Sequence, residues 1–372
     1  MLELSSDVGI LPDTAIEVLI RQGGIQAEKA LDPDQVQPAS LDLRLGARAY
    51  RVRASFLPGE RHLVADRLAG LTLHAFSLDQ GAVLETGCVY IIPLLESVDL
   101  PSFLGATANP KSSTGRLDVF TRVITDYGMA FDTVPAGYCG PLYLEVSPRT
   151  FPVLARTGSR LSQMRFRVGQ PRLTDDRLRR LDDEAQLVEQ MPARIEGGLG
   201  ISIDLAGMSG GDVVGFRAKR HTGVVDVDAK SGQDVDDFWE PVIRTQTDSL
   251  ILDPDEFYIL VSREAVHVPP DYAAEMVAVD TLVGEFRVHY AGFFDPGFGH
   301  DEAGGSGSRA VLEVRSRDVP FIVEHGQFVG KLVYEAMQSR PRTLYGMDIG
   351  SNYQAQGLKL SKHFRPWRRL QG

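Results

Sequence analysis

Two stretches of the chain decide its architecture. Residues Leu84–Pro101 read LETGCVYIIPLLESVDLP, and residues Leu252–Pro269 read LDPDEFYILVSREAVHVP. The numbering of the two stretches differs by 168 (252 minus 84), and this offset aligns a tyrosine, an isoleucine, a glutamate, a valine and a proline. The same offset places Leu144-Glu145-Val146 on Leu312-Glu313-Val314. A single offset held over this distance predicts that one fold is present twice.

Each half is predicted to be mainly β. The chain holds 37 glycines and 21 prolines, which separate short apolar runs such as Val89–Ile92 and Phe257–Val261. The opening strands also match, because Ala39–Leu43 (ASLDL) resembles Gly200–Leu205 (GISIDL) through a shared Ser-x-Asp-Leu pattern. We therefore expect short strands joined by tight turns in both halves.

Few helices are expected. One is predicted near the N-terminus, after Pro12, and a linker helix is predicted where Thr174 can serve as the N-cap and Leu178 and Leu181 follow at helical spacing. The predicted organisation is an N-terminal domain over 1–172, a linker helix over 173–198, a second repeat over 199–340 and a basic tail over 341–372.

Composition excludes several functions. The chain has 39 Lys plus Arg against 50 Asp plus Glu, a net charge of -11, which argues against binding nucleic acid or an anionic membrane through overall charge. No run approaches the 18 apolar residues of a membrane span. Two cysteines, Cys88 and Cys139, are too few for a disulfide framework or a multi-cysteine zinc site, and they suit a reducing cytoplasm.

Two features could carry chemistry. The segment Lys111–Arg116 reads KSSTGR and concentrates cations and hydroxyls that suit a phosphate, although a polar turn between strands would look much the same. Glu145 is a lone carboxylate in the apolar strand Pro141–Val146, so it either faces solvent or lines a cleft where it can carry protons. The solvent face is the ordinary outcome, but Glu313 at the same place in the second repeat favours a functional role.

These residues resemble those of the dCTP deaminases in the trimeric dUTPase superfamily. Within Gly87–Arg116, the run LLESVDLP followed by KSSTGR is similar to that family's Ser-Ser-x-x-Arg region. The resemblance continues in the strand Leu142–Glu145, in Gln37–Gly46 (QPASLDLRLG), and in Tyr353–Gly357 (YQAQG) with Ser361-Lys362 near the C-terminus. It implies two tandem dUTPase-like units, each a distorted β-barrel or jelly roll, in a homo-oligomer for which a trimer is favoured.

The resemblance also implies a deamination site that converts dCTP to dUTP and ammonia. Glu145 would be the catalytic acid/base, Arg116 would hold the carboxylate and water, and Ser112 would position that water. The residues implied to bind the nucleotide are Lys111, Ser113, Asp132, Tyr353, Gln356 and Lys362. Zinc deaminases carry H-x-E and P-C-x-x-C motifs that this sequence lacks, so we expect no zinc, and Mg²⁺ would arrive as the nucleotide complex.

The second repeat departs from the pattern. It holds the family's turn almost unaltered as Phe294–Gly299 (FDPGFG), yet Val279–Gly284 stands where the serines and arginine are expected. The first repeat has a longer turn at Phe131–Gly137, and the equivalence of Asp132 is open. We therefore predict that the first repeat is catalytic, and that the second is either a scaffold or contributes Asp295 and Glu313 to a composite site.

Two alternatives to a plain dCTP deaminase remain. The first is an enzyme that also cleaves dUTP to dUMP, or a plain dUTPase, although Leu358–Phe364 does not resemble the glycine-rich, arginine-containing end of dUTPases. The second is a regulator that binds nucleotides without turning them over. The joint presence of Ser112, Arg116 and Glu145 argues against it.

Overall fold

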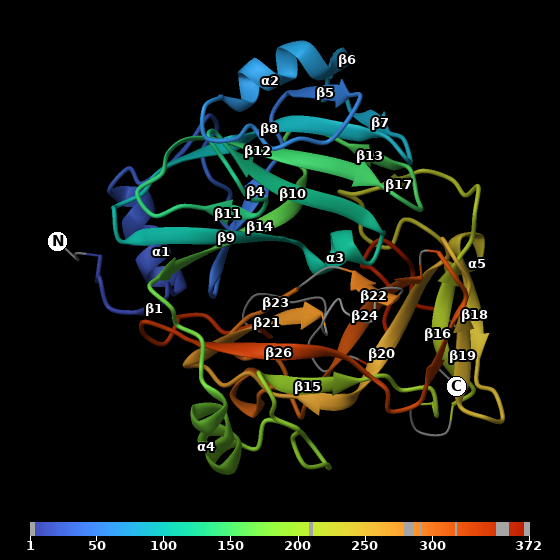
Figure 1. The fold of residues 1–372 in the computed structure, drawn as a ribbon. Coiled ribbons are helices and arrows are strands. Elements are labelled where there is room, and N and C mark those ends of the chain that lie inside the picture. The colour runs from blue at the N-terminus through green and yellow to red at the C-terminus, as the bar shows by residue number, and fades with distance from the viewer. Residues whose placement is uncertain are drawn as a thin grey trace. The chain divides into compact units, whose positions relative to one another are not determined.

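The computed structural model describes residues 4–207, 211–278, 286–289, 292–316, 318–346 and 357–367. The chain is mainly β, as predicted, and divides into two compact units (Figure 1). Unit 1 comprises Met1–Pro171, Gly223–Gln233 and Met337–Arg342; unit 2 comprises Arg172–Thr222, Asp234–Ala336 and Thr343–Gly372. No helix among the described residues is long and apolar enough to cross a bilayer.

Unit 1 is built from two six-stranded sheets and one small sheet. The first sheet has the order β11 (Thr133–Val134), β9 (Leu104–Pro110), β14 (Arg160–Val168), β4 (Ser40–Arg44), β3 (Val36–Gln37), with β1 (Gly9–Ile10) on β14. The second has the order β10 (Val119–Thr125), β12 (Cys139–Pro148), β8 (Val89–Asp99), β5 (Arg48–Val52), β6 (Thr72–Ser77), with β2 (Ile25–Ala27) on β8. The small sheet holds β17 (Val225–Asp226), β13 (Val153–Ala155) and β7 (Ala82–Leu84); the helices are α1 (Asp13–Arg21), α2 (Val64–Leu71) and α3 (Ser112–Gly115).

Unit 2 follows the same plan. One sheet has the order β15 (Leu199–Ser202), β26 (Phe328–Ala336), β21 (Tyr272–Ala278), β23 (Phe293–Phe294). The other has the order β18 (Trp239–Ile243), β16 (Val213–Ala218), β20 (Phe257–Val266), β24 (Ser308–Ser316), β22 (Phe286–His289). A two-stranded sheet pairs β19 (Ser249–Leu252) with β25 (Phe321–Glu324), and the helical segments are α4 (Asp175–Ala185), α5 (Val235–Phe238) and the 3-10 turn η3 (Asp301–Ala303).

The strand orders confirm the predicted duplication. The path β11-β9-β14-β4 in unit 1 recurs as β23-β21-β26-β15 in unit 2, and β10-β12-β8-β5-β6 recurs as β22-β24-β20-β16-β18. Strand β14 spans Arg160–Val168 and β26 spans Phe328–Ala336, so the offset of 168 holds at both ends of this strand. The description of each unit as a distorted barrel or jelly roll stays a prediction.

The predicted match between the opening strands is in the wrong register. In unit 1, Leu41 pairs with Met164. In unit 2, the residue equivalent to Met164 is Leu332, and it pairs with Leu199. Leu41 therefore corresponds to Leu199. The shared Ser-x-Asp-Leu pattern instead aligned Leu41 with Ile203, four residues later in the chain. Side chains alternate with a period of two, so a shift of four residues leaves the pattern of inward and outward positions unchanged, and the pattern alone cannot exclude it.

Both predicted helices are present. Helix α1 starts at Asp13 with Pro12 at its N-cap, and α4 starts at Asp175 with Thr174 at its N-cap, although Thr174 makes no side-chain capping bond. Leu178 and Leu181 of α4 are buried in the hydrophobic core of unit 2. The helix therefore packs as part of unit 2.

A short segment from the second half of the sequence completes unit 1. Strand β17 pairs in parallel with β13, where the amide of Val225 donates to the carbonyl of Pro152 at 3.0 Å. Arg156 forms ion pairs with Asp226 at 2.7 Å and with Asp228 at 3.3 Å. Residues 223–233 thus form a strap on unit 1.

Candidate functional site

The predicted serine and arginine of the KSSTGR segment lie together at the end of β9. Ser112 opens the single turn α3, and the Nε of Arg116 donates to its hydroxyl at 3.1 Å. Arg116 is 2% exposed, and Ser113 and Thr114 are buried beside it. The arginine is thereby held by the segment that contains it, as expected for side chains one helical turn apart.

Lys111 already has a carboxylate partner. Its ammonium forms an ion pair with Asp42 on β4, a residue whose side chain is 3% exposed. Arg160 also approaches Asp42, at 3.5 Å, and bonds to Asp32 and Asp34. The hydrogen bond from Arg160 lowers the pKa of Asp34. Contact between Lys111 and a phosphate would therefore require this lysine to exchange or share its carboxylate.

Glu145 is buried, so the structure rules out the solvent-facing alternative. It lies in the middle of β12, between Ile91 on β8 and Arg122 on β10, and its side chain is 1% exposed. Arg122 donates from Nε to the Oε1 of Glu145 at 2.9 Å and also from Nη2 to the same oxygen. Among the residues the structure describes, Oε2 of Glu145 has no hydrogen-bond partner.

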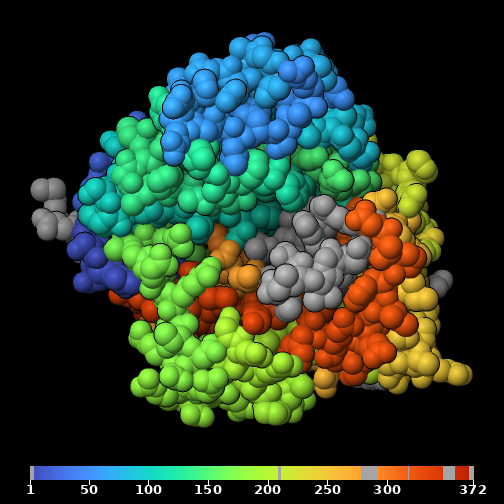
Figure 2. Space-filling model, viewed as in Figure 1, coloured from blue at the N-terminus to red at the C-terminus, as the bar shows by residue number. Residues whose placement is uncertain are grey.

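Apolar side chains cover this face of the sheet. Val64 and Leu68 of α2 form a cluster with Ile91 and Ile124, against which Phe56, Phe131 and Tyr143 pack. Figure 2 shows the residues around α2 in blue at the surface of unit 1. Burial raises the pKa of Tyr143. Glu145 is thus a buried carboxylate beside apolar side chains, with one oxygen bonded to Arg122 and the other, among the described residues, unbonded.

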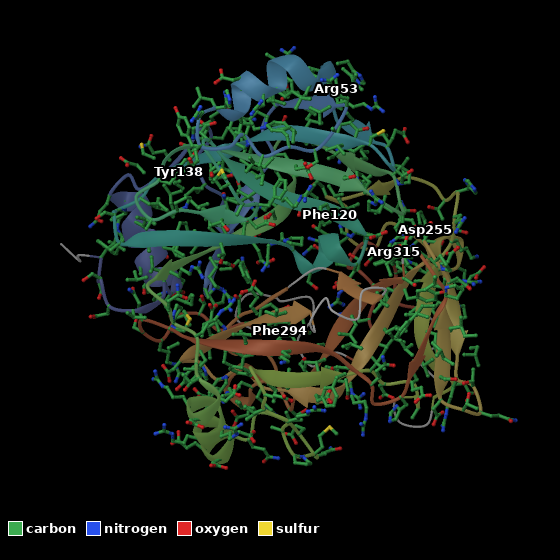
Figure 3. The ribbon with its side chains drawn as sticks, in the orientation of Figure 1. Arg53, Phe120, Tyr138, Asp255, Phe294 and Arg315 are labelled. Carbon is green, nitrogen blue, oxygen red and sulfur yellow. The ribbon has the colours of Figure 1, made fainter. Side chains whose placement is uncertain are left out.

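Arg122 was missed by the sequence analysis. It is the lone cation in Val119–Thr125, an apolar strand that otherwise reads like the one around Glu145, and this shared pattern is the signal that could have found it. Its guanidinium carbon lies 3.6 Å from the ring centre of Phe131 and 4.7 Å from that of Phe120, which is labelled in Figure 3. Within the described residues, Glu145 is hydrogen-bonded by Arg122, and neither Ser112 nor Arg116 forms a hydrogen bond with it.

Asp132 has a structural place in the long turn of unit 1. Its φ of 57° is left-handed, and its Oδ1 accepts a hydrogen bond from the amide of Val123 at 2.7 Å. The backbone hydrogen bonds of the two turns show that Asp132 is not the equivalent of Asp295. The carbonyl of Pro135 accepts from the amide of Tyr138 at 3.1 Å, as that of Asp295 accepts from Phe298 at 3.1 Å. Pro135 therefore stands in unit 1 where Asp295 stands in unit 2.

Comparison with known proteins identifies the family. The model described as 2'-deoxycytidine 5'-triphosphate deaminase (DCD) N-terminal domain matches residues 7–170, and the model of the corresponding C-terminal domain matches residues 174–364. The chain belongs to the dCTP deaminase family. The dCTP deaminase of Halorubrum lacusprofundi is 32% identical over 160 residues, which cover 42% of this chain and 76% of that protein.

Two further comparisons extend this result. The crystal structure of 2'-deoxycytidine 5'-triphosphate deaminase from Agrobacterium tumefaciens has a TM-score of 0.86 and 61% sequence identity, covering 90% of this chain and 99% of that one. A protein of Coprothermobacter proteolyticus named "dCTP deaminase, dUMP-forming" is 29% identical over 160 residues, covering 42% of this chain and 81% of its own length. The predicted resemblance to dCTP deaminases is confirmed.

Unit 2 of this dCTP deaminase family member keeps a buried glutamate at the matching place. Glu313 is 6% exposed and lies between Ile259 and His289 in the backbone pairing, as Glu145 lies between Ile91 and Arg122. Asp295 follows β23 and is buried. Residues 279–284, which correspond to the Ser-Ser-x-x-Arg region, are outside the described residues in this unit.

The C-terminal segment 357–367 packs on unit 2. Phe364 contacts Phe238 and Trp239, with ring centres 5.4 Å and 5.8 Å away, and Trp367 lies edge-on to Phe216 at 5.3 Å. Lys362 lies in this segment next to the buried Ser361 and His363, which bond to each other. Tyr353 and Gln356, also predicted to bind the nucleotide, are outside the described residues.

Proposed function

We propose that the protein is a hydrolase that converts dCTP to dUTP and ammonia, in the supply of pyrimidine deoxynucleotides. Membership of the dCTP deaminase family through both halves of the chain supports this activity. The observation that carries the assignment of the site is Glu145, a buried carboxylate with one oxygen held by Arg122 and the other, among the described residues, unbonded. A group able to accept and return protons in a water-poor setting suits this reaction.

The proposed chemistry needs one carboxylate and one water. Glu145 takes a proton from the water while the water oxygen forms a bond to C4 of the base. Glu145 then delivers that proton to N3 of the base. It then takes the remaining proton from the new hydroxyl and gives it to the amino nitrogen at C4. The carbon–nitrogen bond breaks, ammonia leaves, and a carbonyl remains, so that all atoms of dCTP and water appear in dUTP and ammonia.

Other residues are assigned roles by the same proposal. Ser112 and Arg116 would position the water and support the charge that develops at C4, and Lys111 and Ser113 would contact the phosphates. Further nucleotide contacts are proposed for Asp132, Tyr353, Gln356 and Lys362. Asp295 and Glu313 are proposed as contributors to a composite site, as an alternative to a purely structural second unit.

The proposal also covers the metal ion, the assembly and the location of the enzyme. Mg²⁺ would enter bound to the triphosphate, as part of the substrate. Within the described ranges no cluster of three or more His, Cys, Asp or Glu side chains could hold a metal ion, and independence from zinc stays a prediction. The resemblance noted in the sequence supports a homotrimer. Cys88 and Cys139 are both free thiols, which supports a location in the reducing cytoplasm.

A second candidate function is cleavage of the product to dUMP, because the similar protein of Coprothermobacter proteolyticus is named as dUMP-forming.

One experiment separates deamination to dUTP from deamination followed by cleavage to dUMP. The full chain is incubated with dCTP and Mg²⁺, ammonia is measured, and the nucleotides are separated by ion-exchange chromatography. We expect ammonia and dUTP in equal amounts. Accumulation of dUMP with pyrophosphate would identify the bifunctional enzyme, and absence of ammonia would refute deamination.

A further inference from the structure

We propose that Arg122 is a positioning residue for deamination: it fixes Glu145 through Oε1, so that Oε2 alone carries the proton transfers. The inference rests on the proposed function, since it takes Glu145 as the acid/base. It adds a residue that the Ser-Ser-x-x-Arg region does not contain and that acts on the substrate only through Glu145.

The hydrogen bonds from Arg122 to Glu145 are not shared between the two carboxylate oxygens. Arg122 directs both Nε and Nη2 to Oε1, whereas a fork-to-fork arrangement would give each oxygen one donor. Oε2 lies buried and, within the described residues, without a partner. Leaving a buried acceptor without a hydrogen bond is unfavourable, so an oxygen in this state indicates a position kept open for a proton donor. The amino group of the base and the attacking water are such donors.

Arg122 is itself held from three sides. Its Nη2 donates to the hydroxyl of Ser55 at 2.8 Å, in the stretch that follows β5. Its guanidinium stacks on Phe131 from the long turn and on Phe120 from its own strand. Planar contacts of this kind fix the orientation of a guanidinium, which a lysine ammonium would lack. The carboxylate is therefore held by a side chain that has little freedom of its own.

This arrangement is particular to unit 1. The backbone register places His289 opposite Glu313, where Arg122 stands opposite Glu145. The connection that supplies Phe131 in unit 1 is also longer than the corresponding connection in unit 2, as the described strands on either side show. Arg122 and Thr133 are 11 positions apart (133 minus 122), whereas their counterparts His289 and Phe293 are 4 apart (293 minus 289). At this backbone position unit 2 therefore pairs its glutamate with a histidine instead of an arginine, and its connection between the two strands is shorter.

An arginine that served only as a structural counter-ion to Glu145 would make the same contacts. The test must therefore separate that structural role from the positioning role. The full-length protein is assayed with dCTP and Mg²⁺ as wild type, Arg122→Ala, Arg122→Lys, Glu145→Gln and the double variant Arg122→Ala/Glu145→Gln. We expect Arg122→Ala to lower kcat about 10²-fold with KM nearly unchanged, because misplacement of a reacting group by about 1 Å has that effect. Arg156→Ala, which breaks an ion pair in the strap on unit 1, is the matched control and should keep kcat.

Two further readouts distinguish positioning from folding. Added guanidinium chloride at millimolar concentration should restore part of the activity of Arg122→Ala, whereas urea, which has a similar shape and no charge, should not. The double variant should be no slower than Glu145→Gln, because Arg122 acts through that carboxylate. If Arg122→Ala melts below the assay temperature, Arg122→Lys carries the test, with an expected fall in kcat of about tenfold.

The outcomes are separable. Wild-type kcat in a folded Arg122→Ala or Arg122→Lys, or a double variant clearly slower than Glu145→Gln, overturns the positioning role and leaves the proposed function intact. Wild-type activity of Glu145→Gln overturns the assignment of Glu145 itself, and no ammonia from the wild type overturns the proposed function.

Discussion

The change Glu145→Gln tests the catalytic assignment most directly. The substitution preserves the shape of the side chain, and its amide oxygen can still accept from Arg122, but the amide cannot shuttle protons. We expect turnover to fall by roughly 10²–10⁴-fold or more, which adds about 2.7–5.4 kcal/mol to the barrier at about 1.36 kcal/mol for each tenfold. The side chain is only 1% exposed, so bulk water cannot take over the proton transfers.

Stability should change far less than rate. The substitution removes the ion pair at a cost of about 1–2 kcal/mol, because the charged Arg122 can still donate to the amide oxygen and keeps its bond to Ser55. The assay follows ammonia release over a range of dCTP concentrations, together with the equilibrium affinity for dCTP and the melting temperature. Binding should be largely retained.

Glu313→Gln is the matched control, because the same change is made at the equivalent place in unit 2. It should slow turnover far less, since no arginine stands opposite Glu313 in the backbone register. Equal damage from the two substitutions, or greater damage from Glu313→Gln, would refute the view that unit 1 holds the acid/base.

Three further predictions concern metal, tail and strap. Purified protein should contain no stoichiometric zinc and should stay active after a zinc-selective chelator once Mg²⁺ is restored; zinc whose removal abolishes turnover would contradict this. Phe364→Ala should destabilise unit 2 by about 3–5 kcal/mol, measured by denaturant unfolding, because the ring is buried against Phe238 and Trp239, whereas loss of the exposed Arg365 ion pair should cost at most about 1 kcal/mol. In the strap, the hydrogen bond from Arg156 lowers the pKa of Asp226 below its ordinary value of 3.8, so the stabilisation is present above that pH and is lost as the pH falls through the folded value. The difference in melting temperature between wild type and Arg156→Gln should therefore shrink below about pH 3.8, and a difference that grows in acid would show that the pair is not its source.

Much of the fold could be predicted because the relevant signals are local. Short apolar runs between glycines and prolines indicate strands wherever they occur, and one offset repeated along the chain indicates duplication without any knowledge of contacts. The KSSTGR segment and the Leu142–Glu145 strand identified the family for the same reason, since each is a short contiguous motif. Ser112 and Arg116 are also one helical turn apart, so their contact followed from spacing.

What the sequence by itself determined is therefore the β class, the duplication and the family. The tertiary structure alone decided which residues meet. Glu145 faces Arg122, and Pro135 rather than Asp132 matches Asp295, because strand register and turn length set these pairings. The register of paired strands depends on bulges such as the one between Pro141 and Tyr143. Because side chains alternate with a period of two, the sequence pattern cannot distinguish registers that differ by an even number of residues. The strap 223–233 and the docked segment 357–367 likewise depend on contacts between residues far apart in the chain, which no local pattern encodes.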